Sequence, residues 1–154
     1  MNEETLIRTI QERIGADDWT GALDAILRHM NADSGTIHWM GAGGALHLKV
    51  ASAGIPPVVV EKVRVVPVGK GMAGLAAERR QPVTACNIQT DGSGDVRPGA
   101  KLTGLEGAIA LPMFDGDRVV GVLGVANRGE RTFREEEQEL LDRIGRAMSA
   151  ARPR

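Results

Sequence analysis

The 154-residue sequence has a single cysteine, no tyrosine and an aromatic content of only 3%. One cysteine, Cys86, excludes an internal disulfide and any metal site built from several cysteines. So few aromatic side chains leave almost no stacking platform for single-stranded nucleic acid. A net charge of −1 gives no electrostatic reason to expect nucleic acid or an anionic membrane as a partner.

The sequence also has no long hydrophobic run. A membrane-spanning helix needs roughly 18 apolar residues, and residues 1–14 carry early acids and no continuous apolar core, so we expect neither a membrane span nor a secretory signal. Hydrophobic residues make up 42% and charged residues 25%, which is typical of a globular domain. We therefore expect a cytoplasmic protein with an N-terminal helix in 1–16, a single domain in 17–150 and a short tail in 151–154.

Hydrophobic periodicity predicts helices near both ends and two hairpins between them. Apolar residues recur at helical spacing over 6–14, over 19–30 and again after Phe133. Alternating patterns joined by glycine-containing turns predict hairpins over 36–52 and 108–127. Between the hairpins we expect a short helix from 57, a helix over 71–80, a short strand over 82–86 and a polar, glycine-rich loop over 87–104.

The stretch VGKGMAGL (68–75) contains the spacing G-x-G-x-x-G, which is typical of dinucleotide sites. Such a site needs strands that alternate with helices in a parallel sheet, whereas hairpins flank this motif and indicate antiparallel pairing. We therefore interpret Gly69 and Gly71 as a tight turn into a helix and Gly74 as a point of close packing. Free amides at the helix start remain able to hold an anionic group.

Four stretches in this order resemble the GAF domain family: LHLKVASAGIPP, VRVVPVGKGMAGLAAERRQPV, GLEGAIALPMFDGDRVVGVLGVAN and TFREEEQELLDRIGRAMSAA. The resemblance covers about residues 19–148. It implies an α+β fold with a central antiparallel β-sheet and helices packed on one face. On the other face it implies a small-molecule pocket covered by a loop and short helices.

The resemblance also implies what the chain lacks. Free-methionine sulfoxide reductases of the family use several cysteines, and this chain has only Cys86, which we expect to be a small buried residue, so we expect no enzyme. Bilin-binding members attach the pigment to a cysteine in the region of 87–104, where there is none. Haem would need a pocket-facing ligand, and we expect the strand residues His38 and His47 to be half-exposed. We therefore expect no cofactor and no metal.

Cyclic nucleotide is a further possibility that the family raises. Members that bind it carry an aromatic–acid pair where this sequence has Ala51 and Ser52, so we rank this ligand low. Glu106 stands where many bacterial members have arginine, which disfavours a phosphate or carboxylate. A partial family motif, which we expect to tie the last strand to the closing helix, comprises Asn127, Arg128, Phe133 and Glu137.

Strand alternation and the resemblance together predict an apolar pocket for a small, mostly neutral ligand. Trp39 fits either the pocket floor or the core on the helix side. The predicted lining residues are Thr36, Trp39, Ser52, Met72, Ala73, Leu75, Ile88, Leu102, Leu111 and Met113.

The function that we expect is sensory or regulatory: a small molecule binds the pocket and biases a dimer, an output domain or a partner protein. The alternative is a dimerisation module with a vestigial pocket. The first and last helices carry apolar stripes that exceed what one sheet face needs, which predicts a homodimer through these helices. Alternatively, both stripes pack within one chain. The stripes are Leu6, Ile10 and Ile14, and Leu140, Ile144 and Met148.

Overall fold

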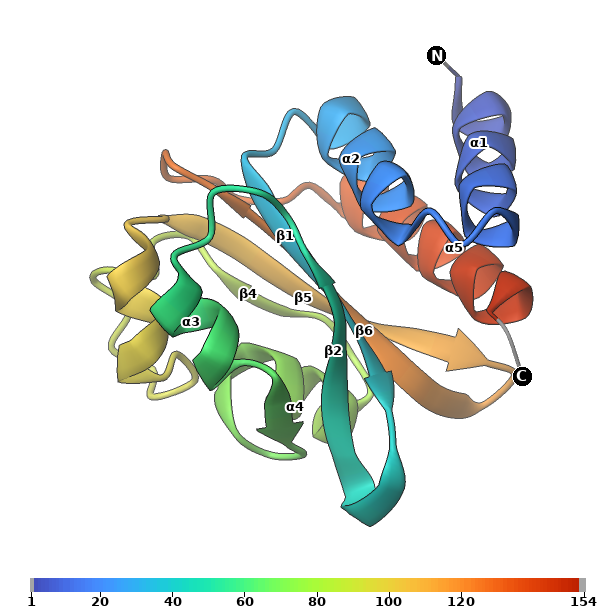
Figure 1. The fold of residues 1–154 in the computed structure, drawn as a ribbon. Coiled ribbons are helices and arrows are strands. Elements are labelled where there is room, and N and C mark those ends of the chain that lie inside the picture. Colours follow the sequence, from blue (N-terminus) through green and yellow to red (C-terminus); the bar gives the residue numbers. More distant parts are fainter. Residues whose placement is uncertain (1, 153–154) are drawn as a thin grey trace.

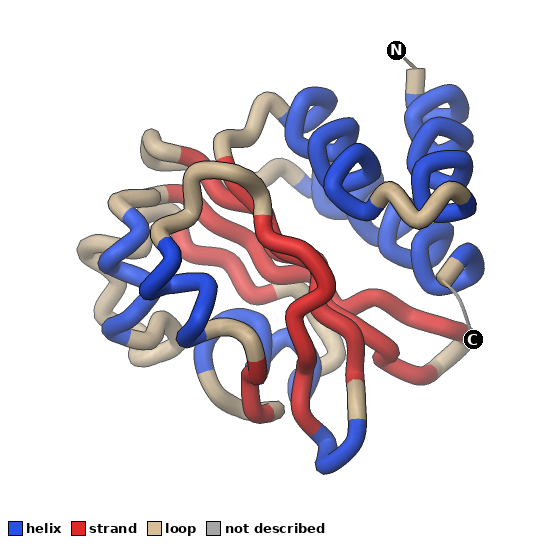
Figure 2. Tube along the Cα trace, viewed as in Figure 1, coloured by secondary structure: helices blue, strands red, loops and turns tan. Residues whose placement is uncertain are grey.

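The computed structural model describes residues 2–152 and has the predicted α+β architecture. Six strands form one sheet in the order β3-β2-β1-β6-β5-β4, and every neighbouring pair is antiparallel (Figures 1 and 2). The elements are α1 (Glu3–Gly15), α2 (Trp19–Met30), β1 (Ser34–Met40), η1 (Ala42–Gly44), β2 (Ala45–Ala51), α3 (Pro57–Lys62), β3 (Val65–Pro67), α4 (Gly71–Arg79), β4 (Val83–Ala85), η2 (Pro98–Thr103), β5 (Gly107–Asp115), β6 (Arg118–Asn127) and α5 (Glu135–Ala151).

Three helices, α1, α2 and α5, cover one face of the sheet and enclose the main core (Figure 1). Helix α2 begins where the side chain of Asp18 accepts a hydrogen bond from the Gly21 N–H, a typical N-cap. Helix α1 packs on α2 and α5, and its Glu3 forms an ion pair with Arg143. Helix α1 is therefore part of the same packed unit as the rest of the described chain. Of the predicted tail, Ala151 ends α5, and 153–154 lie outside the described residues.

The apolar stripes of the terminal helices are buried within this single chain. All six residues of the two stripes, Leu6, Ile10, Ile14, Leu140, Ile144 and Met148, belong to the main core. The expectation of surplus apolar surface is therefore wrong, because α1 packs against the other two helices and uses that surface up. A homodimer through these helices stays a prediction, and surplus apolar surface no longer supports it.

The opposite face of the sheet carries α3, α4 and η2 (Figures 1 and 2). A second, smaller core lies under α4 and includes Leu46, Ala76 and Val122. The segment 87–104 is more ordered than the irregular loop that we predicted, because Pro98 begins the short helix η2 within it. Bidentate hydrogen bonds of 2.8 and 3.2 Å from Arg79 to Asp95 tie this segment to the end of α4.

The glycine motif has the structural role that the flanking hairpins predicted. Gly69 and Gly71 have φ values of 91° and 68°, in the left-handed region that favours glycine. The Gly69 N–H donates to the Gly74 carbonyl at 2.8 Å. A β-carbon on Gly74 would lie 2.3 Å from the carbonyl oxygen of Pro67, so only glycine allows α4 to pack this closely on β3.

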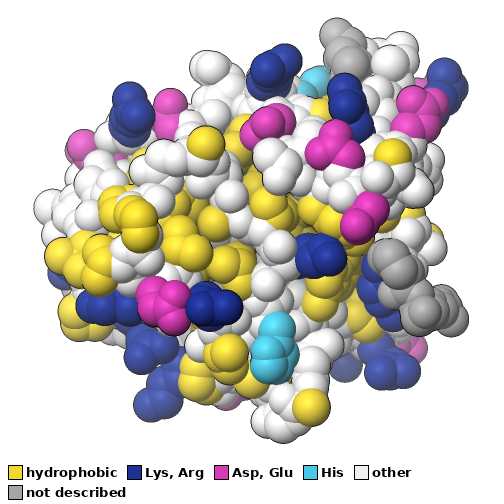
Figure 3. Space-filling model, viewed as in Figure 1, with side chains coloured by type: hydrophobic (Ala, Val, Ile, Leu, Met, Phe, Trp, Pro, Cys, Tyr) yellow, Lys and Arg dark blue, Asp and Glu magenta, His cyan; other side chains and the backbone are white. Residues whose placement is uncertain are grey.

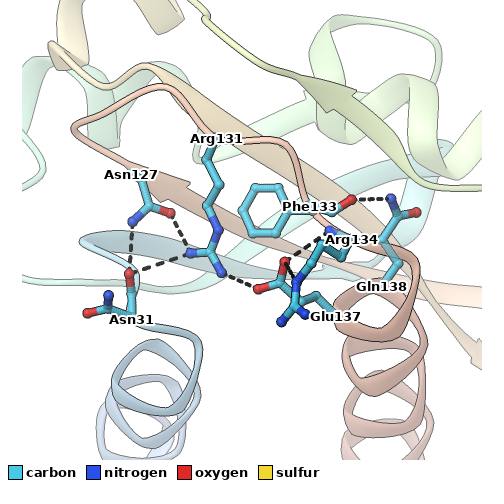
Figure 4. A network of polar contacts seen from close by, with 7 residues as sticks. All are labelled: Asn31, Asn127, Arg131, Phe133, Arg134, Glu137 and Gln138. Carbon is cyan, nitrogen blue, oxygen red and sulfur yellow. Dashed lines mark hydrogen bonds and ion pairs between the residues drawn. The ribbon is translucent and has the colours of Figure 1, made fainter.

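A polar network joins the end of β6 to the start of α5 (Figure 4). Asn127 donates to the carbonyl of Asn31 at 2.9 Å, and Arg131 donates to the Asn127 side chain at 2.8 Å. Arg131 also pairs with Glu137 and stacks on the Phe133 ring, 4.3 Å from its centroid. The predicted structural tie is present.

The cation in this network is not the one that we predicted. Arg128 is exposed and contributes only its backbone N–H, which donates to Asp33. Arg131 lies three residues later, in the turn that leads to α5, and its guanidinium reaches both elements. Counting along the motif alone therefore selected the wrong arginine.

Candidate functional site

A cavity of about 510 Å³ lies between the sheet and the layer formed by α3, α4 and η2. This volume falls within the range of small-molecule sites in proteins. In Figure 3, hydrophobic side chains gather on the side of the molecule where α3 lies. The cavity therefore occupies the face on which we predicted a pocket.

The cavity exists because the sheet presents small residues to it. Ala108 and Ala110 of β5 line the cavity, and their register partners on β6 are Ala126 and Gly124. Thr36 of β1 is the register partner of Gly124 on the other side, and a β-carbon on Gly124 would lie 2.8 Å from the Thr36 Oγ1. Larger residues at these five positions would fill the space, so the sequence keeps the floor open.

The walls come from the short elements that cover the floor. Helix α3 contributes Val59, and the residue that follows it, Val63, also lines the cavity. Helix α4 contributes Met72 and Ala73 from its first turn, and Leu105 closes the side beyond η2. The walls are largely apolar, so they suit a ligand with an apolar body.

His38 is a site residue that the sequence analysis placed wrongly. We expected it to be half-exposed, but it is 2% exposed and lines the cavity. Its Nε2 lies 2.7 Å from the carbonyl oxygen of Val63, so Nε2–H donates there. Its Nδ1 is buried and has no partner among the described residues. Thr36 and His38 are two apart on β1, and this spacing was the signal that could have placed His38 on the floor.

Burial also determines the charge of His38. Desolvation lowers the pKa of His38 below its ordinary value of 6.5, although the hydrogen bond to Val63 opposes this. His38 is therefore neutral at pH 7. With Nε2 protonated, Nδ1 carries a lone pair and acts as an acceptor.

The charged side chains that line the cavity are all basic: Lys62, Lys70 and Arg97. All three are exposed at its rim, and no ion pair involves them among residues 2–152. Glu106, which we expected to disfavour an anion beside the pocket, is not a lining residue. Its carboxylate accepts a hydrogen bond from Asn87 instead.

Three predicted site residues, Thr36, Met72 and Ala73, line the cavity. Ser52 is buried beside it, and its hydroxyl accepts a hydrogen bond from the Gly35 N–H at 2.9 Å. Leu75 packs in the core under α4. These positions are close to the site, while ligand contact itself stays a prediction.

The other predicted lining residues lie elsewhere. Leu111 and Met113 belong to the core on the helix side, because odd-numbered residues of β5 face the helices and Ala108 and Ala110 face the cavity. Trp39 also lies on the helix side, where its ring meets that of Trp19 edge-on at 5.6 Å.

Two predicted lining residues in the segment 87–104 also lie outside the cavity. Ile88 packs with Ala85 and Ala108 in a small separate cluster. Leu102 of η2 is 56% exposed. Sequence pattern could not assign these orientations, because the segment has no strand or long helix to fix them.

The single cysteine is exposed, which corrects our expectation of a buried residue. It follows the buried Ala85 at the end of β4, so alternation turns it outward. Its neighbours are Glu130 and Thr132, and it does not line the cavity. Within residues 2–152 no group of His, Cys, Asp and Glu is arranged to hold a metal ion. In the same range no helix is long and apolar enough to cross a membrane.

Comparisons with known proteins match this fold. Similar solved structures include GAF domains of phosphoenolpyruvate-protein phosphotransferases from Coxiella burnetii (TM-score 0.80, 19% identity, 98% of this chain and 92% of that chain) and Acinetobacter (0.77, 20%, 98% and 93%). A free methionine-R-sulfoxide reductase from Neisseria meningitidis, solved with its substrate, is also similar (0.72, 14%, 98% and 90%). At these identities the likeness shows the fold alone.

The sequence itself carries the family assignment. No curated protein matches the chain. A family model described as GAF domain matches residues 20–152, which include every strand of the sheet and helices α4 and α5, which pack on its two faces. The chain therefore belongs to the GAF domain family.

Proposed function

We propose that this protein is a sensory or regulatory domain that binds a small, largely apolar molecule in the cavity under α4. The observation that carries the proposal is the floor of small residues, which leaves about 510 Å³ open beneath three covering elements. A sheet face covered only for stability would be filled by larger side chains. The proposal also places the domain in the cytoplasm, in keeping with its exposed free thiol, Cys86.

The main alternative is a dimerisation module with a vestigial pocket. An open cavity argues against it, and the apolar stripes that motivated a dimer are buried within the chain. We propose that ligand binding is the primary function, and that any homodimer, output domain or partner protein responds to the bound ligand. The segment 87–104 lies between the cavity and solvent: its helix η2 lines the cavity, and its Asp95 forms an ion pair with Arg79 at the end of α4.

Two narrower functions have less support. Cyclic nucleotide lacks a stacking face at Ala51 and Ser52, and the Ser52 hydroxyl already bonds to Gly35. Sulfoxide reduction, which the Neisseria protein performs, would need thiol chemistry in the cavity, and Cys86 lies outside it. We therefore propose a binding domain without catalytic activity.

A screen of metabolites by thermal unfolding tests the proposed function. A ligand that binds only the folded state stabilises it by about 2.7 kcal/mol at one hundred times its Kd. For a chain of this size that raises the melting temperature by roughly 5 °C or more. We expect at least one such compound, and we expect Ala73→Leu, which places a larger side chain in the cavity wall, to abolish the shift.

Ala16→Leu provides the matched control, because Ala16 is exposed at the end of α1, on the helical side. This variant should respond to the compound as the parent protein does. A panel without any hit, or a hit that stabilises Ala73→Leu equally, would contradict the proposed function.

A further inference from the structure

We infer that the ligand is a small amphipathic anion, with a carboxylate at the first turn of α4 and an apolar body over the floor of the sheet. The inference rests on the proposed function, since it assumes that the cavity takes a small molecule. It adds the charge of the ligand and the place where that charge is held. It also reverses the expectation of a mostly neutral ligand.

The distribution of charge around the cavity is the first argument. The chain as a whole is balanced, with 19 basic and 20 acidic residues. The cavity nevertheless has three basic lining residues, Lys62, Lys70 and Arg97, and no acidic one. The basic rim is therefore a local feature of the site and not a consequence of a basic protein.

Two of the three basic side chains lie near the start of α4, and the third lies beside η2. Lys70 immediately precedes the helix. A β-carbon on Gly71 would lie 3.0 Å from Cδ of Arg97, so the Arg97 stem crosses the first residue of the helix. A β-carbon on Gly99 would lie 3.9 Å from Nζ of Lys62, which places this ammonium beside η2. None of the three is neutralised by a carboxylate among residues 2–152.

The backbone of α4 adds to this positive potential. The helix has nine residues, and no side chain caps its N-terminus. The N–H groups of Gly71, Met72 and Ala73 make none of the backbone hydrogen bonds described outside the helices, and these three residues line the cavity. Unpaired amides and the positive end of the helix dipole both favour an anion here.

His38 indicates independently that the cavity is built for an occupant. It is 2% exposed, lines the cavity and has a buried Nδ1 without a partner among the described residues. A buried acceptor left unpaired is costly, so the occupant, or a water that it holds, is expected to supply a donor. The group lies on the sheet floor, whereas the cations are exposed at the rim, so the cavity offers one occupant both a buried acceptor and positive charge.

The remaining lining limits the ligand to a small charge. The floor is formed by Ala108, Ala110, Gly124 and Ala126, and the walls by Val59 and Met72. These side chains offer no hydrogen bonds, so the polar side chains of the lining are limited to His38, the three hydroxyl residues Ser34, Thr36 and Thr103, and the basic rim. A monoanion whose charge stays at the rim and whose body is apolar suits the basic rim and the apolar lining, while a water held by the ligand donates to His38 Nδ1.

Three probes with the same body and different head groups test the inference: hexanoate, hexanol and hexylamine. Titrations at low ionic strength, followed by the amide NMR signals of Met72 and Ala73, give the affinity of each probe for this cavity. We expect hexanoate to bind about tenfold more tightly than hexanol, because three exposed cations and a helix terminus each contribute modestly. Hexylamine should bind most weakly.

Variants then show which basic side chains bind the carboxylate of the ligand. We expect Arg97→Gln and Lys70→Gln each to weaken hexanoate by about threefold and to leave hexanol unchanged. Arg8→Gln is the matched control, since Arg8 is exposed on α1, on the opposite face. It should leave the affinities of hexanoate and hexanol as they are.

The outcomes separate this inference from the proposed function. Equal binding of hexanoate and hexanol at the cavity would overturn the anion inference and leave the small-molecule site standing. A preference for hexanoate that Arg97→Gln and Lys70→Gln do not reduce would overturn the placement of the charge. If none of the probes binds at millimolar concentration, the inference fails, and the metabolite panel decides the proposed function separately.

Discussion

Gly74→Ala is expected to lower the free energy of unfolding by about 2–3 kcal/mol, the usual cost of overpacking a closely packed site. A β-carbon at this position would lie 2.3 Å from the Pro67 carbonyl oxygen and 3.2 Å from the Gly69 nitrogen. Both are backbone atoms, so no side chain can rotate away. Relief requires α4 to move off β3, and chemical denaturation of the purified variant measures the cost.

Gly15→Ala is the matched control for this substitution. Gly15 also lies in a helix, α1, but a β-carbon there has no neighbour within 4 Å. Alanine has the higher helix propensity, so this variant should be unchanged or more stable by up to about 1 kcal/mol. If Gly74→Ala were as stable as Gly15→Ala, the close approach of α4 to β3 would be wrong.

Arg131→Met is expected to destabilise the protein by about 2–3 kcal/mol, because it leaves a half-buried carboxylate without its main cation. The side chains of Arg131 and Glu137 are only 18% and 16% exposed. The variant loses the 2.8 Å bond to Asn127 and the ion pair to Glu137 together (Figure 4). Urea unfolding at neutral pH measures this loss.

Arg128→Met is the matched control, because it also removes one arginine charge but leaves the side-chain network of Arg131 intact. Arg128 is exposed and bonds to Asp33 only through its backbone N–H, which methionine retains. We expect a change within about 0.5 kcal/mol. A loss equal to that of Arg131→Met would contradict the assignment of Arg131 as the cation of the tie.

The same network predicts a dependence on pH. Partial burial raises the pKa of Glu137, but hydrogen bonds from the Arg134 N–H and from Arg131 outweigh it and hold the pKa below its ordinary value of 4.5. The folded state therefore binds this proton less readily than the unfolded state. The network therefore contributes fully to the free energy of unfolding above the ordinary pKa of Glu137. This contribution is lost as the pH falls through the lowered pKa of Glu137 in the folded state. The difference in free energy of unfolding between the parent protein and Arg131→Met should therefore become smaller as the pH falls over that range.

The fold followed from patterns that local chemistry fixes. Period-2 alternation on either side of short turns gave both hairpins, and hairpins require antiparallel pairing. The helix expected over 71–80 is α4, Gly71–Arg79, which ends shortly before Pro82, a residue that cannot continue a helix. Gly69, Gly71 and Gly74 were interpreted correctly because the surrounding strands excluded a parallel sheet.

The site was predicted less well, because alternation shows that two faces exist but not which face is which. Leu111 and Met113 were placed in the pocket since large apolar residues are typical of ligand sites. The structure has the reverse arrangement, in which large residues fill the helix-side core and alanines leave room for the ligand. The small residues of β5 and β6 were the more informative signal.

Long-range packing was also beyond the sequence. The burial of His38 depends on Val63, which is 25 residues away and covers it from the end of α3. The burial of the α1 stripe depends on α5, at the other end of the chain. No local pattern reports either contact, so we expected His38 to be half-exposed and the α1 stripe to leave surplus apolar surface.

The methyl NMR signals of the methionines test most directly whether a ligand occupies the cavity. Met72 lines the cavity, whereas Met30, Met113 and Met148 lie in the core on the helix side and serve as internal references. During titration with a compound from the thermal screen, the Met72 signal should shift in a saturable manner while the three reference signals stay in place. Saturable shifts at the three reference methyls with none at Met72 would contradict the account.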